Sequence, residues 1–329
     1  MNATGKCRVE LFAANTRIIN KEFPWQNAMS LRLASLLYAK EGKTVNCEAI
    51  RQCHALVKQN TGVFSAFRGN MAFSLAALLS LYPKPRDVLK ETLKVYDLLK
   101  GVKFHASDFL VGAAYQIASQ SNPSDYVGVI TRARSYYDGM KARHFYNTGQ
   151  DDYIYAAMLG LADIDASSSI ERIERLYSRL KDEFWDKNSV QALAQVLVIG
   201  GLDESVIDRV FALRDAFRAQ KIRLDKTYTL PMLGILALVP VEIDTIVRDI
   251  DDAQGALRAQ KGFGSLSVTT QELLLYISSV IAGVYAENAK EGGVLTAALS
   301  TSITNMIIAQ QAAMTAAVCA SAAAASAST

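Results

Sequence analysis

Polar and apolar positions recur along the chain with the spacing of helices. Apolar residues return every three to four positions, and no run shows the strict alternation that is typical of a half-buried strand. Prolines are scarce, and most of them fall between the periodic runs, where a helical protein tolerates them best. The pattern therefore predicts an all-α protein.

The predicted helices are of two chemical kinds, which alternate along the chain. One kind is amphipathic and charged on one side, and it spans residues 84–100, 125–144, 169–186, 203–223 and 242–261. The other kind contains no charged residue, and it spans residues 71–82, 109–120, 153–162, 189–202, 227–239 and 273–286. A helix that is uncharged and largely apolar all round has to be covered nearly all round. We therefore expect the neutral helices to form a sheltered inner layer, with the charged helices outside it.

The alternation amounts to an internal repeat. Residues of the Asn, Asp, Ser and Thr class, which cap helix N-termini, stand where the neutral runs begin. These residues are Asn70, Ser107, Asp151, Ser189, Thr227 and Thr270, at intervals of 37, 44, 38, 38 and 43 residues. Helix pairs at this spacing predict αα-hairpin repeats that form an α-solenoid or a closed α/α toroid. Residues 1–329 would then be a single repeat domain, with N-terminal cap helices in 1–60, hairpin repeats in 61–291 and a closing segment in 292–329.

The closing segment, residues 292–329, is uncharged and rich in alanine, which is the best helix former. We expect it to form a helix that packs on the inner layer of the array. Its many Thr, Ser, Asn and Gln residues make it a poor membrane span. The internal neutral runs are shorter than the roughly 20 residues that a bilayer requires. Membrane insertion is therefore not expected.

Composition narrows the choice of partners and compartment. The chain carries 35 basic and 32 acidic residues without a basic tract, so the electrostatic footprint of a nucleic-acid binder is missing. Four scattered cysteines are too few for a disulfide framework and fit a reducing cytosol. The polar start of the chain does not have the pattern of a signal peptide. We expect a cytoplasmic protein that does not bind nucleic acid.

Polar residues near the starts of the neutral runs are the candidate ligand-binding residues. They are Arg68, Asn70, His105, Asp108, His144 and Asp152. Arg68 beside a helix N-terminus would make an anion site, and the two histidines are the candidate general acids or bases. A structural interpretation competes with each of these roles. Gly69 would allow a turn, and Asn70 would cap the helix that follows it. The helix dipole would stabilise the negative charge of Asp152 in the first turn of its helix. A histidine in a connection would make local hydrogen bonds.

Familiar catalytic and cofactor motifs are missing from the sequence. We find no phosphate-binding glycine loop, no G-x-S-x-G and no H-E-x-x-H. Three histidines are too few for a convincing metal centre. We therefore expect neither a metal nor a cofactor.

Several stretches are similar to a known family. They are KEFPWQNA (21–28), YAKEGKTVNCEAI (38–50), NTGVFSAFRGN (60–70), DDYIYAAML (151–159) and AQQAAM (309–314). Together they resemble a bacterial family catalogued as a domain of unknown function, the one numbered four thousand and three. The resemblance implies a bacterial origin and carries no assigned activity.

Two functions stay open at this point. The first is a non-enzymatic helical-repeat protein that binds a protein or small-molecule partner, because stacked helix pairs build extended binding surfaces. The alternative is an enzyme of unknown reaction, with a pocket at the mouth of an α/α toroid lined by the candidate residues. We favour the first, since no catalytic constellation is recognised and a fold by itself supplies no function.

Overall fold

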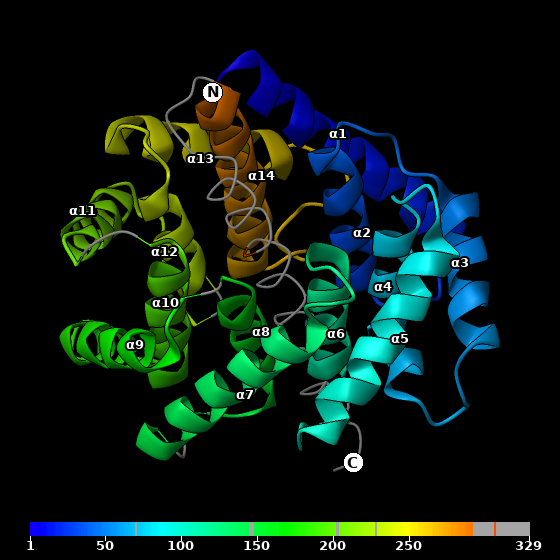
Figure 1. Cartoon of the computed structure of the whole chain (residues 1–329). Coiled ribbons are helices and arrows are strands. Elements are labelled where there is room, and N and C mark those ends of the chain that lie inside the picture. The colour runs from blue at the N-terminus through cyan, green and yellow to red at the C-terminus, as the bar shows by residue number, and fades with distance from the viewer. Residues whose placement is uncertain are drawn as a thin grey trace, which may run out of the picture. The chain divides into compact units, whose positions relative to one another are not determined.

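The computed structural model describes residues 1–69, 71–144, 148–162, 164–201, 204–227, 229–291 and 306. Within these ranges every regular element is helical, with fourteen α-helices and two short 3₁₀ segments (Figure 1). The prediction of an all-α protein is confirmed. No helix in the described ranges combines the length and the apolar character needed to cross a membrane.

The contacts between residues divide the chain into two compact units. Unit 1 contains Met1–Arg17, Tyr38–Thr44 and the described residues of Glu171–Gln310. Unit 2 contains Ile18–Leu37 and the described residues of Val45–Ile170. Three helices contribute residues to both units: α1 (Ala3–Glu22), α2 (Ala28–Lys40) and α9 (Ala166–Leu180).

Unit 2 is built from helices of both kinds in alternation. Its charged helices are α3 (Cys47–Gln59), α5 (Pro85–Gly101) and α7 (Tyr126–Arg143). Its neutral helices are α4 (Ala72–Leu79), α6 (Asp108–Gln120) and α8 (Tyr153–Leu161), with η1 (Ala66–Arg68) and η2 (Gln150–Asp152) ahead of α4 and α8. Helix α6 packs against both α5 and α8, while α4 packs on α3 and α8 on α7. Neutral helices thus contact each other and their charged neighbours.

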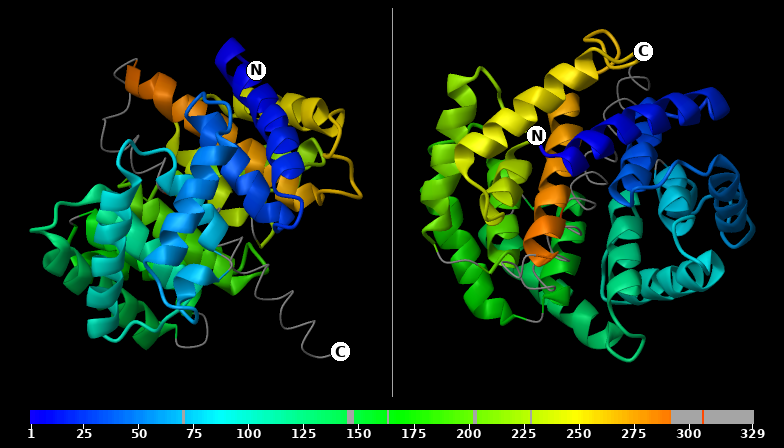
Figure 2. Two further views of the ribbon diagram at one scale, coloured as in Figure 1. Left: turned by 90° about the vertical axis from the view of Figure 1, so that its right-hand side faces the viewer. Right: turned by 90° about the horizontal axis from the view of Figure 1, so that it is seen from above.

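Unit 1 continues the alternation. Its charged helices are most of α9, α11 (Val206–Ala219) and α13 (Ile243–Arg258). Its mainly uncharged helices are α10 (Lys187–Ile199), α12 (Leu230–Leu238) and α14 (Thr270–Glu291). Helix α12 contacts α10, α11 and α14, and Figure 2 shows α14, in orange, against α13, in yellow.

Three of the neutral helices, α4, α8 and α12, are buried on nearly all sides, as their composition predicts. Every residue of α4 and of α12 is buried, and α8 is buried except for its last residue. Charged helices bury one side only: in α5, Leu89, Val95 and Leu99 are buried among exposed lysines and acids. Each fully buried Leu, Ile or Val side chain stabilises the fold by about 1.5–3 kcal/mol. Burial of the neutral helices is therefore a main source of stability.

An arginine from a charged helix closes the C-terminal end of the next neutral helix, once in each unit. In unit 2, Arg132 of α7 donates from Nε to the carbonyl of Gly160 at 2.9 Å. In unit 1, Arg209 of α11 donates from Nε to the carbonyl of Ala237 at 3.1 Å, and it also reaches the carbonyls of Val239 and Val241. Gly160 and Ala237 are both the next-to-last residue of their helices. The carbonyls at a helix end lack partners within the helix, and these arginines supply them.

The predicted closing helix over 292–329 lies outside the described residues, with the exception of Met306. The side chain of Met306 is fully buried. Packing of this segment on the neutral helices stays a prediction.

Candidate functional site

Five of the six residues singled out in the sequence belong to unit 2, and the sixth, Asn70, lies outside the described residues. Arg68 ends η1, and its guanidinium donates to the carbonyl of Thr61 at 2.6 Å and to that of Lys58. These carbonyls lie in the last turn of α3 and just beyond it, where backbone acceptors lack helical partners. The structure therefore uses the guanidinium of Arg68 to close α3.

Asp108, the first residue of α6, reaches back to the start of the preceding neutral helix. Its Oδ1 accepts a hydrogen bond from the backbone N–H of Met71 at 3.2 Å, ahead of α4. A Cβ atom on Gly69 would lie 2.5 Å from this oxygen, so any other residue would displace the Asp108 carboxylate. Glycine thus leaves room for the close approach of Asp108, while its φ of −76° is ordinary. The structure brings Asp108 together with the segment that follows Arg68.

The remaining candidates make backbone contacts of their own. Asp152 is buried and accepts a hydrogen bond from the N–H of Gly149 at 2.9 Å, which closes η2. His105 has an exposed side chain, and its backbone N–H donates to the hydroxyl of Tyr153 at 3.3 Å. His144 ends α7 with its N–H bonded to the carbonyl of Met140. These contacts hold the turns that precede α6 and α8.

Sequence analysis did not single out the part of unit 1 where α10, α12 and α14 begin. The hydroxyl of Ser189 in α10 donates to the carbonyl of Thr227 at 2.7 Å. The hydroxyl of Thr229 then donates to Oε1 of Gln271 in α14 at 3.0 Å, and Nε2 of Gln271 donates to the carbonyl of Arg223 at 2.9 Å. The first turns of these three helices are therefore linked side by side. We call residues 183–189, 218–227, 229–230 and 266–272 the start edge of unit 1.

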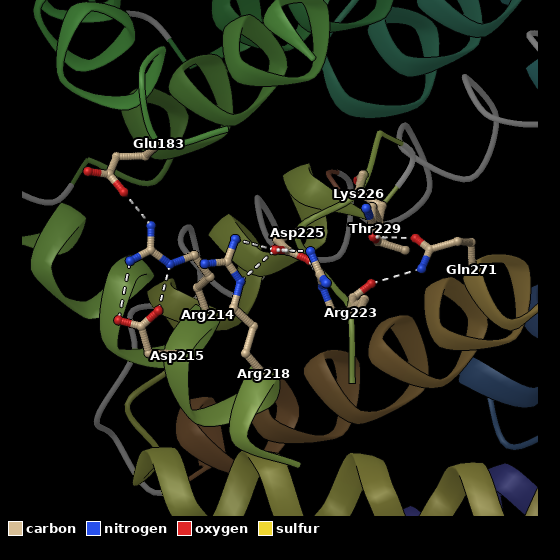
Figure 3. A network of polar contacts seen from close by, with 9 residues as sticks. All are labelled: Glu183, Arg214, Asp215, Arg218, Arg223, Asp225, Lys226, Thr229 and Gln271. Carbon is tan, nitrogen blue, oxygen red and sulfur yellow. Dashed lines mark hydrogen bonds and ion pairs between the residues drawn. The ribbon is translucent and has the colours of Figure 1, made fainter. Parts of the chain in front are cut away.

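A buried carboxylate between two arginines lies on the start edge (Figure 3). The side chain of Asp225 is 3% exposed, and it accepts hydrogen bonds from Nε of Arg218 at 2.7 Å and from Nε of Arg223 at 2.9 Å. Burial alone would raise the pKa of Asp225. The hydrogen bonds from Arg223 and Arg218 outweigh burial and hold its pKa below the usual value. Asp225 is therefore ionised at neutral pH and fixes both guanidinium groups.

A pocket of about 380 Å³ opens beside this cluster. Arg218, Arg223 and Lys226 line it, together with Trp185, whose side chain is 97% exposed. The guanidinium-bearing side chains remain 41% and 49% exposed even though both pair with Asp225. The pocket thus combines fixed cationic groups with an exposed aromatic ring.

The other acids in the lining of the pocket are already engaged. Glu183 accepts a hydrogen bond from Nη1 of Arg214 at 2.7 Å (Figure 3). The guanidinium of Arg214 also lies over the ring of Phe211, 4.9 Å from its centroid. Asp186 caps α10 by accepting from the N–H of Asn188 at 3.0 Å. These carboxylates are committed to the scaffold.

A local sequence signal for this site exists. Arg218 lies seven residues before Asp225, Arg223 lies two before it and Lys226 follows it directly. All four belong to the end of one charged helix and the connection to the next neutral one. Sequence reasoning treats such charges as solvent-facing, and only burial of Asp225 distinguishes this group from an ordinary connection.

The described part of the chain holds no group of three or more His, Cys, Asp or Glu side chains that could bind a metal ion. Cys7, Cys47 and Cys53 are all in the thiol form. Burial raises the pKa of the Cys53 thiol, which disfavours the reactive thiolate.

Comparison with known proteins gives a single result. A family model described as a protein of unknown function, DUF4003, matches residues 15–312. No curated protein and no solved structure matches the chain. The match covers most of the chain and brings no activity with it.

Proposed function

The chain belongs to the DUF4003 family, whose function is unknown, and from its described residues we propose a non-enzymatic helical-repeat protein that binds a protein partner. The partner would bind at the start edge of unit 1. The observation that carries this proposal is the exposed ring of Trp185 beside a pocket, on an edge whose helices are linked to one another.

Recurrent contacts support the repeat architecture on which the proposal depends. Arg132 and Arg209 each bond a carbonyl 28 residues further along, at the same position of a neutral helix. Hydrogen bonds also join the starts of successive neutral helices. Asp108 accepts from the N–H of Met71, which lies 37 residues earlier, and Ser189 donates to the carbonyl of Thr227, which lies 38 residues later. Equivalent residues of stacked hairpins meet at intervals of about one repeat, so such recurrence favours an α-solenoid or α/α toroid. A single array over residues 1–329 stays a prediction.

Exposed apolar side chains support the choice of the start edge. Trp185 and Leu266 are both fully exposed, and each lies in a connection that leads into α10 or α14. Large apolar residues on a polar background are typical of protein interfaces, and tryptophan is the residue most enriched at their energetic centres. Buried helices hold both ends of these connections. A partner would therefore lose little binding free energy to ordering the loops of the start edge.

The enzyme alternative has no comparable support. Arg68 donates to the carbonyls of Lys58 and Thr61 and to the Thr61 hydroxyl, while Asp108 and Asp152 accept from the backbone N–H groups of Met71 and Gly149, and these bonds close helix ends and turns. The proposal also places the protein in the bacterial cytoplasm, which its few and scattered cysteines favour.

Paired capture experiments test the proposed function. The immobilised full-length protein, Trp185→Ala and Trp25→Ala are each exposed to a bacterial lysate, and retained proteins are quantified by mass spectrometry. Trp25 is the matched control, because it is also 97% exposed but lies in the connection between α1 and α2. We expect at least one protein to be retained by the wild type and by Trp25→Ala and to be lost from Trp185→Ala. Equal retention by all three would contradict the proposal, provided that circular dichroism shows all three folded.

A further inference from the structure

We propose that the pocket on the start edge of unit 1 binds the carboxylate of an acidic side chain in a peptide segment. Arg218 and Arg223 would hold the carboxylate, and Trp185 would pack against an apolar residue beside it. This inference rests on the proposed function and names the chemistry of the partner.

Both arginines are held in place before any ligand arrives. Asp225 fixes Arg223 through Nε at 2.9 Å and Nη2 at 3.2 Å, and Arg218 through Nε at 2.7 Å. In each guanidinium, Nη1 has no hydrogen-bond partner among the described residues. Planar guanidinium groups match a carboxylate in shape, and such charge-assisted hydrogen bonds are about twice as strong as neutral ones. Donors that are already oriented lose little side-chain entropy on binding.

The charge is locally positive where the ligand would bind, on the side of the pocket formed by Arg218, Arg223 and Lys226, although three acids complete the charged part of the lining. Asp225 is a single carboxylate shared between two arginines, so one positive charge of the cluster is not compensated by it. Glu183 bonds Arg214, which also bonds Asp215, and Asp186 caps the N-terminus of α10, so both of these acids of the lining are held away from the two arginines by other partners. Lys226 adds a further cation to the lining and makes no ion pair within the described ranges.

The same residues favour a carboxylate over a phosphate. Glu183 and Asp186 remain within the lining, and their charges would repel a dianion more strongly than a monoanion. The apolar ring of Trp185 contributes nothing to the binding of a free inorganic anion. It can, however, bury an apolar side chain of a peptide, and burial of apolar surface favours binding. A volume of about 380 Å³ lies within the range of sites for small ligands and suits one or two side chains.

The ring of Trp185 provides the assay. The chain contains two tryptophans, so Trp25→Phe leaves Trp185 as the only one. This variant is titrated with an array of acetylated and amidated pentapeptides in which a central Glu is flanked by Leu or Phe. The same array with Gln at the centre and inorganic phosphate are titrated in parallel. We expect a blue shift of the Trp185 emission with Glu peptides, and an affinity at least about tenfold lower for the Gln peptides.

Three substitutions in the Trp25→Phe background separate the parts of the pocket. Arg223→Gln should weaken binding by about tenfold or more, and Arg223→Lys should also weaken it, because lysine keeps the charge and loses the planar fork. Asp225→Asn should weaken binding as well, although it makes the pocket more positive, because both arginines lose their anchor. The control is Arg175→Gln, which removes the exposed pair of Arg175 with Glu204 on unit 1 and should leave binding unchanged.

The inference is wrong if no Glu peptide shifts the emission, if Gln peptides bind equally, or if phosphate alone binds. Tighter peptide binding by Asp225→Asn would show that attraction between opposite charges, and not two oriented arginines, accounts for binding.

Failure of the carboxylate site can be distinguished from failure of the proposed function. A lysate protein that is lost from Trp185→Ala and still retained by Arg223→Gln would leave the start edge as the binding surface and remove the carboxylate site.

Discussion

Gly160 offers a sharp test of how closely the helices of unit 2 pack. It is the next-to-last residue of α8 and faces α7. A Cβ atom added at Gly160 would lie 2.6 Å from the carbonyl oxygen of Val129, 3.0 Å from the N of Ala133 and 3.1 Å from its Cβ. Two of these neighbours are backbone atoms of a helix and cannot turn aside. Gly160→Ala therefore forces α8 away from α7.

The expected loss of stability follows from two opposing effects. Alanine is favoured over glycine inside a helix by about 1 kcal/mol. Overpacking a close contact costs about 1–3 kcal/mol, and a 2.6 Å approach to a backbone oxygen belongs at the upper end of that range. Displacement of α8 also strains the 2.9 Å hydrogen bond from Arg132 to the Gly160 carbonyl. We expect Gly160→Ala to lower the free energy of unfolding by about 2 kcal/mol.

Gly128 supplies the matched control, because it lies in α7, the helix that Gly160 packs against. A Cβ atom at Gly128 would meet only Nη1 of Arg132 at 3.6 Å, an ordinary contact. Gly128→Ala should therefore raise the free energy of unfolding by about 0.5–1 kcal/mol. Urea unfolding followed by circular dichroism measures both variants. If Gly160→Ala proves as stabilising as Gly128→Ala, α8 does not approach α7 as closely as the structure shows.

Two further substitutions test unit 1. Arg209→Gln leaves the carbonyls of Ala237, Val239 and Val241 without their donor. It should lower the free energy of unfolding, measured with urea, by about 2–3 kcal/mol. Arg175→Gln, which removes an exposed ion pair, is the control, and an equally small loss in both variants would contradict this expectation. Lys40 is buried, and burial lowers its pKa from 10.5 to about 8. Because the unfolded chain then binds more protons between these values, stability should rise from about pH 8 to pH 10. Lys40→Met should abolish that rise and increase stability at pH 7 by up to about 3 kcal/mol, and an unchanged pH profile would refute the assignment.

Much of the fold could be predicted from sequence because burial of a neutral helix is a local property. A helix that is apolar nearly all round has no polar face to present to water. The predicted run 227–239 contains α12, and the run 153–162 contains α8, with both helices almost entirely buried. Charged helices follow the same logic, since 84–100 and α5 differ by one residue at each end. Sequence patterns settle which segments are helical and which faces are covered.

Helix starts were harder to predict, because several residues of one class compete at each start. Ser189 was expected to cap its helix, but Asp186 caps α10 and Ser189 instead links it to Thr227. Thr270 was expected at the last start, but the hydroxyl of Thr269 accepts from the N–H of Glu272. The residue with extended backbone becomes the cap, and Asp186 has φ −88° and ψ 106°. Tertiary packing sets those angles, which composition does not reveal.

Functional candidates show the same limit more severely. Arg68 is the candidate anion-binding residue in the sequence, yet its guanidinium closes the end of α3. Arg218 and Arg223 looked like ordinary solvent-facing charges, yet a buried carboxylate holds both of them beside a pocket. What separates the two cases is where each guanidinium is held. The bonds of Arg68 run to Lys58 and Thr61, at the end of α3. Arg218 and Arg223 share the carboxylate of Asp225 instead, and both line a pocket beside the exposed ring of Trp185.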